Sequence, residues 1–332
     1  MPGVGGQPHI GALRHVRLVQ ETTFGEVPVA PDWTSLPILE DGFKLKATSE
    51  RYWGNTNYGG DHRRHMAVHH KLDVAGDLVT LPWPEATLLM LDMALERDAS
   101  LDLYSYTIDH YTPVDPRRYL GAVAERLTIG FEPPEVRFTL GMRAKLEQEY
   151  NALVPGDFDY SGLTLSPFMY AGAEIRINDV LYTHIDSGTL TIENNVAAGP
   201  PVRTAGTPLG TAAYLIAQQR AISFESTQLN WDDEFNEAIR DGGLFSLDIR
   251  LYHPAGHICQ IQVPAMVVEE SDEDGTPDQV AKESPRLEAL VPSGGTNDII
   301  YAVDLTPTTT LAGLTTTTAP TTTAAATTTA PA

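Results

Sequence analysis

The strongest local signal in the sequence is a strand–helix–strand pattern over residues 222–253. Its helix is predicted to begin at Asn230, because an asparagine side chain can accept a hydrogen bond from the first free backbone N–H groups. Residues 232–234 are all acidic, as the positive end of the helix dipole favours, and Gly242 follows where a left-handed cap is wanted. Alternate residues of the next strand are apolar: Phe245, Leu247, Ile249 and Leu251. This period of two predicts a sheet with one buried face.

The first half of the chain contains a similar pattern. Residues 72–81 are predicted to form a strand, and residues 101–111 a second one. Between them, Pro84 lies at the start of a predicted helix, where proline is well tolerated. The predicted helix has an apolar side and an acidic opposite side: Leu88, Leu91 and Leu95 against Glu85, Asp92 and Glu96. Further alternating runs follow each unit: 123–131 and 136–142 in the first half, 259–263, 287–290 and 299–303 in the second.

Two such units predict a duplicated chain of mainly β structure. We expect two similar antiparallel β-sandwich or barrel modules in tandem, each with one short α-helix. The first spans residues 1–150 and the second residues 151–305. Within the first, residues 49–70 are predicted to form a long loop or extended hairpin, and in the second, residues 269–283 an acidic loop. Residues 306–332 contain only Thr, Ala, Pro, Leu and Gly, so we expect a disordered tail.

The net charge of −22 argues against a protein that holds nucleic acid or an anionic membrane. The single cysteine, Cys259, lies in an alternating strand pattern and is expected to be a buried apolar residue. The N-terminus lacks the apolar run of a secretory signal, and no run is long enough to span a bilayer. We therefore expect a soluble chain that is made and folded in a cytoplasm.

Catalytic and metal-binding patterns find little support. His65 and His69 have helical spacing, but the zinc-protease pattern requires Glu where Met66 stands, and His62 and His70 do not complete a set. The acidic run resembles a calcium loop until its twelfth position, which is Ala281 instead of a bidentate Glu. We expect no enzyme, no cofactor and no metal site. The aromatic residues Trp53, Tyr58, Trp83 and Trp231 are instead candidates for an assembly interface.

Four segments of the sequence resemble the tail tube proteins of tailed bacteriophages. They lie in the family's order and at roughly its spacing: QETTFGEVP at 20–28, AGDLVTLPWPEATLLMLDMAL at 75–95, GTLTIENNV at 188–196, and the strand–helix–strand unit at 220–248. The resemblance covers most of residues 13–305 and excludes the tail.

The resemblance implies a structural protein of the virion tail, synthesised in the host cytoplasm, whose copies join sheets edge to edge into stacked rings. Its partners would be further copies of itself and other tail proteins, such as tape measure, terminator and baseplate components. DNA would pass the lumen without specific binding. With two modules per chain, a ring of three chains is expected, with a ring of six as the alternative. Other functions that suit the sequence are a capsid decoration or baseplate protein and a carbohydrate-binding module.

Overall fold

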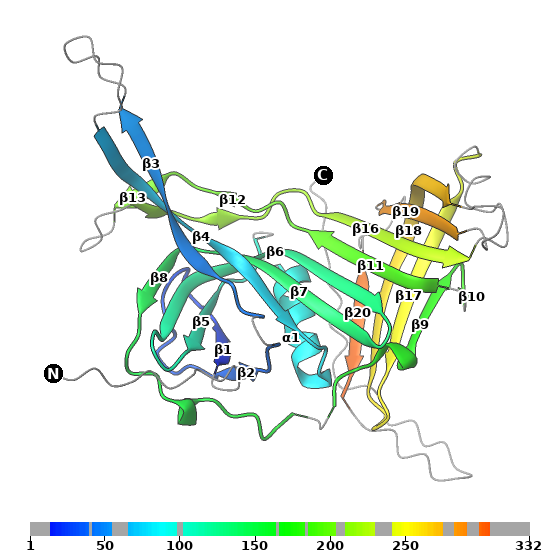
Figure 1. The fold of residues 1–332 in the computed structure, drawn as a ribbon, viewed down its shortest axis with the longest axis horizontal. Coiled ribbons are helices and arrows are strands. Elements are labelled where there is room, and N and C mark those ends of the chain that lie inside the picture. Colours follow the sequence, from blue (N-terminus) through cyan, green and yellow to red (C-terminus); the bar gives the residue numbers. More distant parts are fainter. Residues whose placement is uncertain are drawn as a thin grey trace.

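The computed structural model of the chain describes ten segments: residues 14–39, 42–54, 66–97, 102–163, 166–182, 185–203, 210–229, 241–274, 282–290 and 299–305. These segments are mainly β-strands, and 18 of the strands belong to one continuous hydrogen-bonded sheet (Figure 1). Almost all of its pairings are antiparallel; the exception is a single parallel contact between Gly210 and Lys71. The mainly β fold expected from the alternation is confirmed.

Within its described residues, the first half has eight strands and one helix: β1 (His15–Gln20), β2 (Thr34–Leu36), β3 (Lys46–Gly54), β4 (Met66–Thr80), α1 (Pro84–Leu95), β5 (Tyr106–Tyr111), β6 (Arg117–Glu132), β7 (Glu135–Ala144) and β8 (Leu146–Glu149). β1 pairs with β2 and β5, and β4 pairs with β3 and β7. The long strand β6 pairs with β5, β7 and β8. Of residues 49–70, expected as a loop or extended hairpin, 49–54 lie in β3 and 66–70 in β4, and residues 55–65 lie outside the described segments.

The second half begins with two short 3-10 helices, η2 (Pro155–Asp157) and η3 (Tyr170–Gly172). Its strands are β9 (Ala173–Ile177), β10 (Val180–Leu181), β11 (Ile185–Glu193), β12 (Ala197–Ala198), β13 (Pro201–Arg203), β14 (Gly210–Ala212), β15 (Leu215–Ile216), β16 (Ala221–Leu229), β17 (Leu244–Tyr252), β18 (Ile258–Asp274), β19 (Lys282–Ala289) and β20 (Ile300–Asp304). β9 pairs with β10 and β17, and β16 pairs with β11 and β19. The long strand β18 pairs with β17, β19 and β20.

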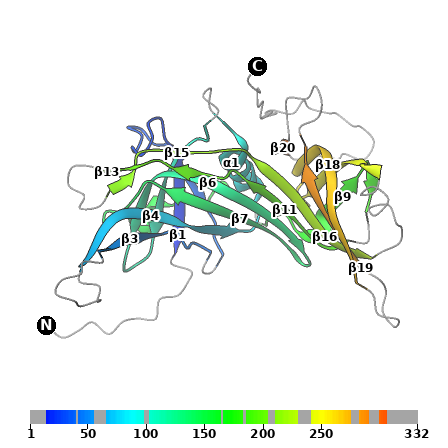
Figure 2. The same cartoon turned by 90° about the horizontal axis from the view of Figure 1, so that it is seen from above.

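One strand pair joins the two halves. β11 pairs antiparallel with β6 in an unbroken register from Gly188 opposite Phe131 to Glu193 opposite Arg126. Strands β4, β7, β6, β11 and β16 therefore run side by side as one curved sheet, which Figure 2 shows from above. Along β11 the predicted alternation is confirmed, since Leu190 and Ile192 are fully buried while Glu193 is exposed.

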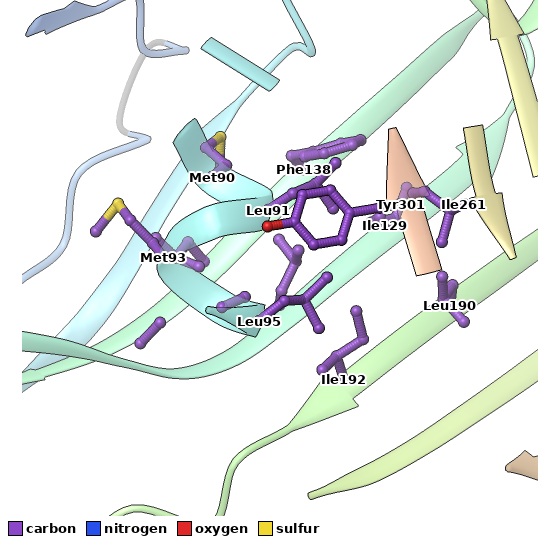
Figure 3. Close-up of a cluster of buried hydrophobic side chains, with 14 of the residues drawn as sticks. Met90, Leu91, Met93, Leu95, Ile129, Phe138, Leu190, Ile192, Ile261 and Tyr301 are labelled. Carbon is purple, nitrogen blue, oxygen red and sulfur yellow. The ribbon is translucent and has the colours of Figure 1, made fainter. Parts of the chain in front are cut away.

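α1 packs against one face of this sheet, over β6 and the second half's β18 and β20 (Figure 3). The helix was predicted correctly, but its predicted apolar stripe is only partly right. Met90 and Leu91 are fully buried, whereas Leu88 is only half-buried at the margin of the core. The helix is covered from several directions because the β18 and β20 strands of the other half also reach it.

Asp92, on the predicted acidic side of the helix, is half-buried and contacts a strand of the other half. Tyr301, on β20, points its hydroxyl toward α1 and donates a hydrogen bond of 2.7 Å to Asp92 Oδ1. A local helical pattern cannot predict this contact, because its donor comes from a strand 209 residues further along the chain.

The expected acidic loop at 269–283 is a second correction. Residues up to Asp274 belong to β18 and pair with β19, which begins at Lys282. A polar run can continue a strand because the pairing is made by the backbone. In addition, Arg286 on β19 forms ion pairs with two nearby carboxylates, at 3.1 Å from Glu269 and 3.5 Å from Glu288. The first five positions of the calcium-loop pattern, 270–274, lie in this strand, and the other seven lie outside the described residues.

Several expectations fall outside the described residues: the helix at 230–240, the histidines His62 and His65, and the tail at 306–332. Cys259 is fully buried within β18, as expected.

Candidate assembly surface

The face of the curved sheet opposite α1 is polar. Its cations stand beside carboxylates: Arg143 Nε lies 3.0 Å from Glu125, and Arg126 lies 3.8 Å from Asp77. Between these pairs the strands present threonine and glycine, such as Thr128, Thr139, Thr189 and Thr191. The large apolar side chains that are exposed among the described residues lie on other elements. This surface, called the open face below, is therefore charged, its Arg126 and Arg143 are paired with carboxylates, and it has no apolar patch among the described residues.

The open face carries a shallow depression of about 310 Å³, lined by Gly76, Asp77, Glu125, Arg126, Gly141, Met142, Glu193 and Asn195. Its lining contains carboxylates, a guanidinium and an amide, without a thiol, hydroxyl or imidazole. Within the ten described segments, no three His, Cys, Asp or Glu side chains gather in a way that could hold a metal ion. In the same segments, no helix is both long and apolar enough to cross a membrane.

The QETTFGEVP segment is organised by a buried carboxylate. Glu21 is only 6% exposed and accepts hydrogen bonds from Ser105 Oγ and Thr107 Oγ1, both at 2.8 Å. It also accepts from the backbone N–H groups of Gly25 at 2.7 Å and Gly121 at 2.9 Å. Four donors around one carboxylate compensate the cost of removing it from water. Glu21 therefore ties the loop after β1 to strands β5 and β6.

The GTLTIENNV segment is organised by a buried amide. Asn194 is fully buried and donates from Nδ2 to the backbone oxygens of Ala94 at 2.8 Å and Ala124 at 3.2 Å. Arg220 donates to the backbone oxygen of Leu95 at 2.7 Å. The last carbonyls of a helix have no partner within the helix. Two residues of the second half thus satisfy the C-terminal end of α1, which belongs to the first.

The sequence patterns did not predict a buried ion cluster that is formed by residues of β1, β5 and β6. Asp109 is fully buried between two arginines: Arg118 Nε donates to it at 2.6 Å and Arg17 Nε at 3.0 Å. The Arg17 guanidinium also lies 4.3 Å from the ring centre of Trp33, a favourable cation–π arrangement. Because Arg17 and Asp109 lie 92 residues apart, no local spacing could have identified the pair.

Burial raises the pKa of Asp92 from its ordinary value of 3.8 to about 6. The Tyr301 hydrogen bond lowers this pKa and the nearby Glu96 raises it, but both effects are smaller than that of burial. The carboxyl between α1 and β20 therefore keeps its proton to a higher pH than an exposed aspartate does.

Several strands have a partner on one side only within the described segments, and two of these edges lie at the ends of the curved sheet. β3 pairs with β4 on one side only, and residues 268–274 of β18 pair with β19 on one side only. On the open side of β3, Tyr119 donates its hydroxyl to the Leu45 oxygen at 2.8 Å, and the Ala47 N–H donates to Glu147 at 2.5 Å. Unpaired edges recruit further strands, so these two edges are the candidate interfaces.

The structure places two of the four predicted interface residues. Trp53 is near the end of β3, in register with Ala67 of β4. Trp83 immediately precedes α1 and packs partly buried against the core. Tyr58 and Trp231 lie outside the described residues.

Comparison with known proteins identifies one family. A family model described as phage tail tube protein matches residues 11–281 of the chain. A search of curated proteins found no match.

Proposed function

Because this chain belongs to the phage tail tube protein family, we propose that it closes into rings to which each copy contributes two equivalent modules. Membership in the family makes the protein a structural, non-enzymatic component of the virion tail, where it builds the tail tube. The proposal concerns how this chain does so: its modules, the symmetry of its ring and the face that lines the bore.

The pairing pattern of the two halves supports the equivalence of the modules. β1, β3, β4, β5, β6, β7 and β8 pair among themselves as β9, β11, β16, β17, β18, β19 and β20 do. β1 pairs with β5 in the first half, as β9 pairs with β17 in the second. The long strands β6 and β18 each pair with three other strands of their own half. Strands β12–β15 are an addition to the second half.

Irregularities in the register support the same alignment. The β5–β6 register shifts next to the Tyr106–Ala122 pair, and the β17–β18 register shifts next to the Phe245–Met266 pair. A second shift follows in each half, after Ala124 in β6 and after Val268 in β18. Aligning β6 with β18 by the first shift gives the same residue-to-residue correspondence as aligning them by the second. Register shifts are specific local features, so their agreement is the observation that carries the proposal.

Three chains of two modules each would form a ring with six similar positions, and a ring of six chains is the alternative. In such a ring the open face lines the bore, because α1 and the core cover the other face of the sheet. Carboxylates on the wall would repel the phosphates of a passing duplex, so DNA would move through without specific binding.

Other tail proteins, such as tape measure, terminator and baseplate components, would contact the ends or lumen of the tube. We assign Trp53, on β3, and Tyr58, which follows it in the sequence, to contacts between successive rings, with Trp83 and Trp231 as further interface residues.

Electron microscopy of the purified chain over a range of concentrations, with native mass spectrometry of the smallest closed species, tests the proposal. Hollow tubes built from rings of three chains are expected. Rings of six chains would contradict the two-module ring while leaving the tube intact. A chain that stays monomeric at every concentration, even with tail tips added to start growth, would contradict self-assembly.

A further inference from the structure

We propose that neighbouring copies join through an antiparallel pair between β3 of one copy and residues 270–274 of β18 of the next, with Lys46 opposite Asp272. The inference rests on the proposed two-module ring. It goes further by deriving which residues meet, from the strand pair that already joins the two halves within one chain.

The first step aligns β3 with β11. Lys46 pairs with Ala75 of β4, which in turn pairs with Arg143 of β7. In the second half, Thr191 pairs with Ser223 of β16, which pairs with Glu288 of β19. The two ladders place Lys46 and Thr191 at equivalent positions of their modules.

The second step aligns β6 with β18. The two register shifts that match these strands place Thr128 and Asp272 at equivalent positions. Within the chain, Thr191 lies opposite Thr128 across the junction of the two halves. If the junction between copies repeats the junction within a copy, Lys46 lies opposite Asp272 and Lys44 opposite Asp274.

Charge supports this register independently of the alignment. Lys46, the first residue of β3, and Lys44, two residues before it, are both exposed and lie on the open face. The inferred partner strand carries Glu270, Asp272 and Asp274 at alternate positions. Because residues directly opposite each other in an antiparallel pair share a face, the register sets two lysines against two aspartates. A register moved by one residue would set Lys46 opposite Ser271 or Glu273 and would lose the alignment of both lysines with aspartates.

The backbone groups on the side of β3 that faces away from β4 can become available to such a partner. The backbone groups that point away from β4 at Leu45 and Ala47 are bonded by the side chains of Tyr119 and Glu147 in the single chain. Side chains can release these groups to an incoming strand, whereas a paired strand could not. Each copy has one β3 edge and one β18 edge, so the contact is head-to-tail, the type that builds a ring when the rotation between copies closes.

Charge reversal tests the pair in full-length chain. Lys46→Glu and Asp272→Lys should each raise the critical concentration for tube growth by roughly tenfold, since each replaces attraction by repulsion. The double variant should return it to within about twofold of the unmodified chain. Arg137→Glu is the matched control: it makes the same charge change on the open face of β7, away from the inferred pair. Thermal unfolding of each subunit identifies any variant that fails to fold.

Cross-linking tests the register directly. The Lys44 N–H points to β4, where it donates to Asp77, so by alternation position 46 also directs its backbone groups to β4. Position 46 would then form a non-hydrogen-bonded pair with 272, with Cα atoms about 4.5 Å apart, close enough for a disulfide. In a Cys259→Ala background, oxidised Lys46→Cys/Asp272→Cys tubes should give covalent multimers. Thr128→Cys/Thr191→Cys should cross-link only within a chain, and Lys46→Cys/Glu273→Cys should not cross-link.

The two proposals fail in different ways. Tubes that form normally but show neither the charge rescue nor the 46–272 cross-link overturn the register and leave the ring proposal standing. An unmodified chain that never forms rings overturns the proposed function itself.

Discussion

At the scale of single residues, a buried carboxylate that satisfies four donors should be sensitive to truncation. Glu21→Ala would leave two backbone N–H groups and two hydroxyls around Glu21 without their acceptor. We expect the free energy of unfolding of the subunit to fall by about 2–3 kcal/mol, measured by urea denaturation of the unassembled chain.

Glu26→Ala is the control for this variant, because Glu26 is exposed in the same loop. It should change the free energy of unfolding by no more than about 0.5 kcal/mol. Equal effects of the two substitutions would show that the loop is sensitive in general and that the buried network contributes little.

The Asp92–Tyr301 contact should make stability depend on pH. The unfolded chain releases the Asp92 proton near its ordinary pKa of 3.8, and the folded chain releases it near 6. Between these values the folded state binds more protons, so this residue's contribution to the free energy of unfolding falls as pH rises from about 4 to 6. Asp92→Asn, which keeps an acceptor for Tyr301, should remove this loss and stabilise the subunit at pH 7 by up to about 2 kcal/mol.

The comparison is made by urea denaturation of both proteins at several pH values. The advantage of Asp92→Asn should grow as pH rises through this window and then stay constant. An advantage that is the same at pH 4 and pH 7 would mean that packing, and not ionisation, separates the two proteins.

At the scale of elements, the C-terminal end of α1 depends on residues from the other half. Asn194→Ala would leave the carbonyls of Ala94 and Ala124 without this donor in the core. We expect a loss of about 1–3 kcal/mol in the free energy of unfolding. In hydrogen exchange, the amides at the end of α1 should lose protection first. Thr191→Ala, on the open face of the same strand, should leave that protection unchanged; loss of protection in both variants would point to β11 as a whole.

The elements that sequence predicted correctly are those whose signal is local. Alternation located β11 and β17, and the proline at position 84 located the start of α1. Interpretation failed where a contact spans the chain. The acidic side of α1 gave no indication that Asp92 contacts Tyr301, and the Arg17–Asp109 pair has no local signature. The acidic run at 269–274 read as a loop because its composition is polar, whereas backbone pairing with β19 decided its structure.

The sequence predicted what kind of surface would mediate assembly, but not which strands would form it. The sequence indicated edges that a neighbour must cover, and the aromatic candidates named for them included Trp83, which packs partly into the core of its own chain. The edges themselves, β3 and residues 268–274 of β18, emerge only when the pairings are known. Whether Trp53, Tyr58, Trp83 and Trp231 contribute to the interface stays a prediction.

At the scale of the whole molecule, the β6–β11 pair makes two halves into one curved sheet whose polar face is continuous. If this open face lines the bore, its carboxylates keep a duplex from adhering. Glu193 is exposed at the end of β11, and the Glu225 side chain on β16 is 61% exposed. Replacing both by lysine should make tubes that assemble around short duplex DNA retain it, with nuclease protection that is lost between about 0.05 and 0.2 M salt.

The matched control is the double variant Glu26→Lys/Glu149→Lys, which makes the same change of net charge at exposed sites away from the open face. Tubes of this control should leave the DNA open to nuclease, as unmodified tubes do. Equal retention in both variants would mean that overall charge decides adhesion, because the −22 chain repels DNA at long range. If neither variant retains DNA although its tubes have the normal diameter, the open face does not line the bore. Retention only with the open-face lysines would mean that local charge on the wall governs the passage of DNA.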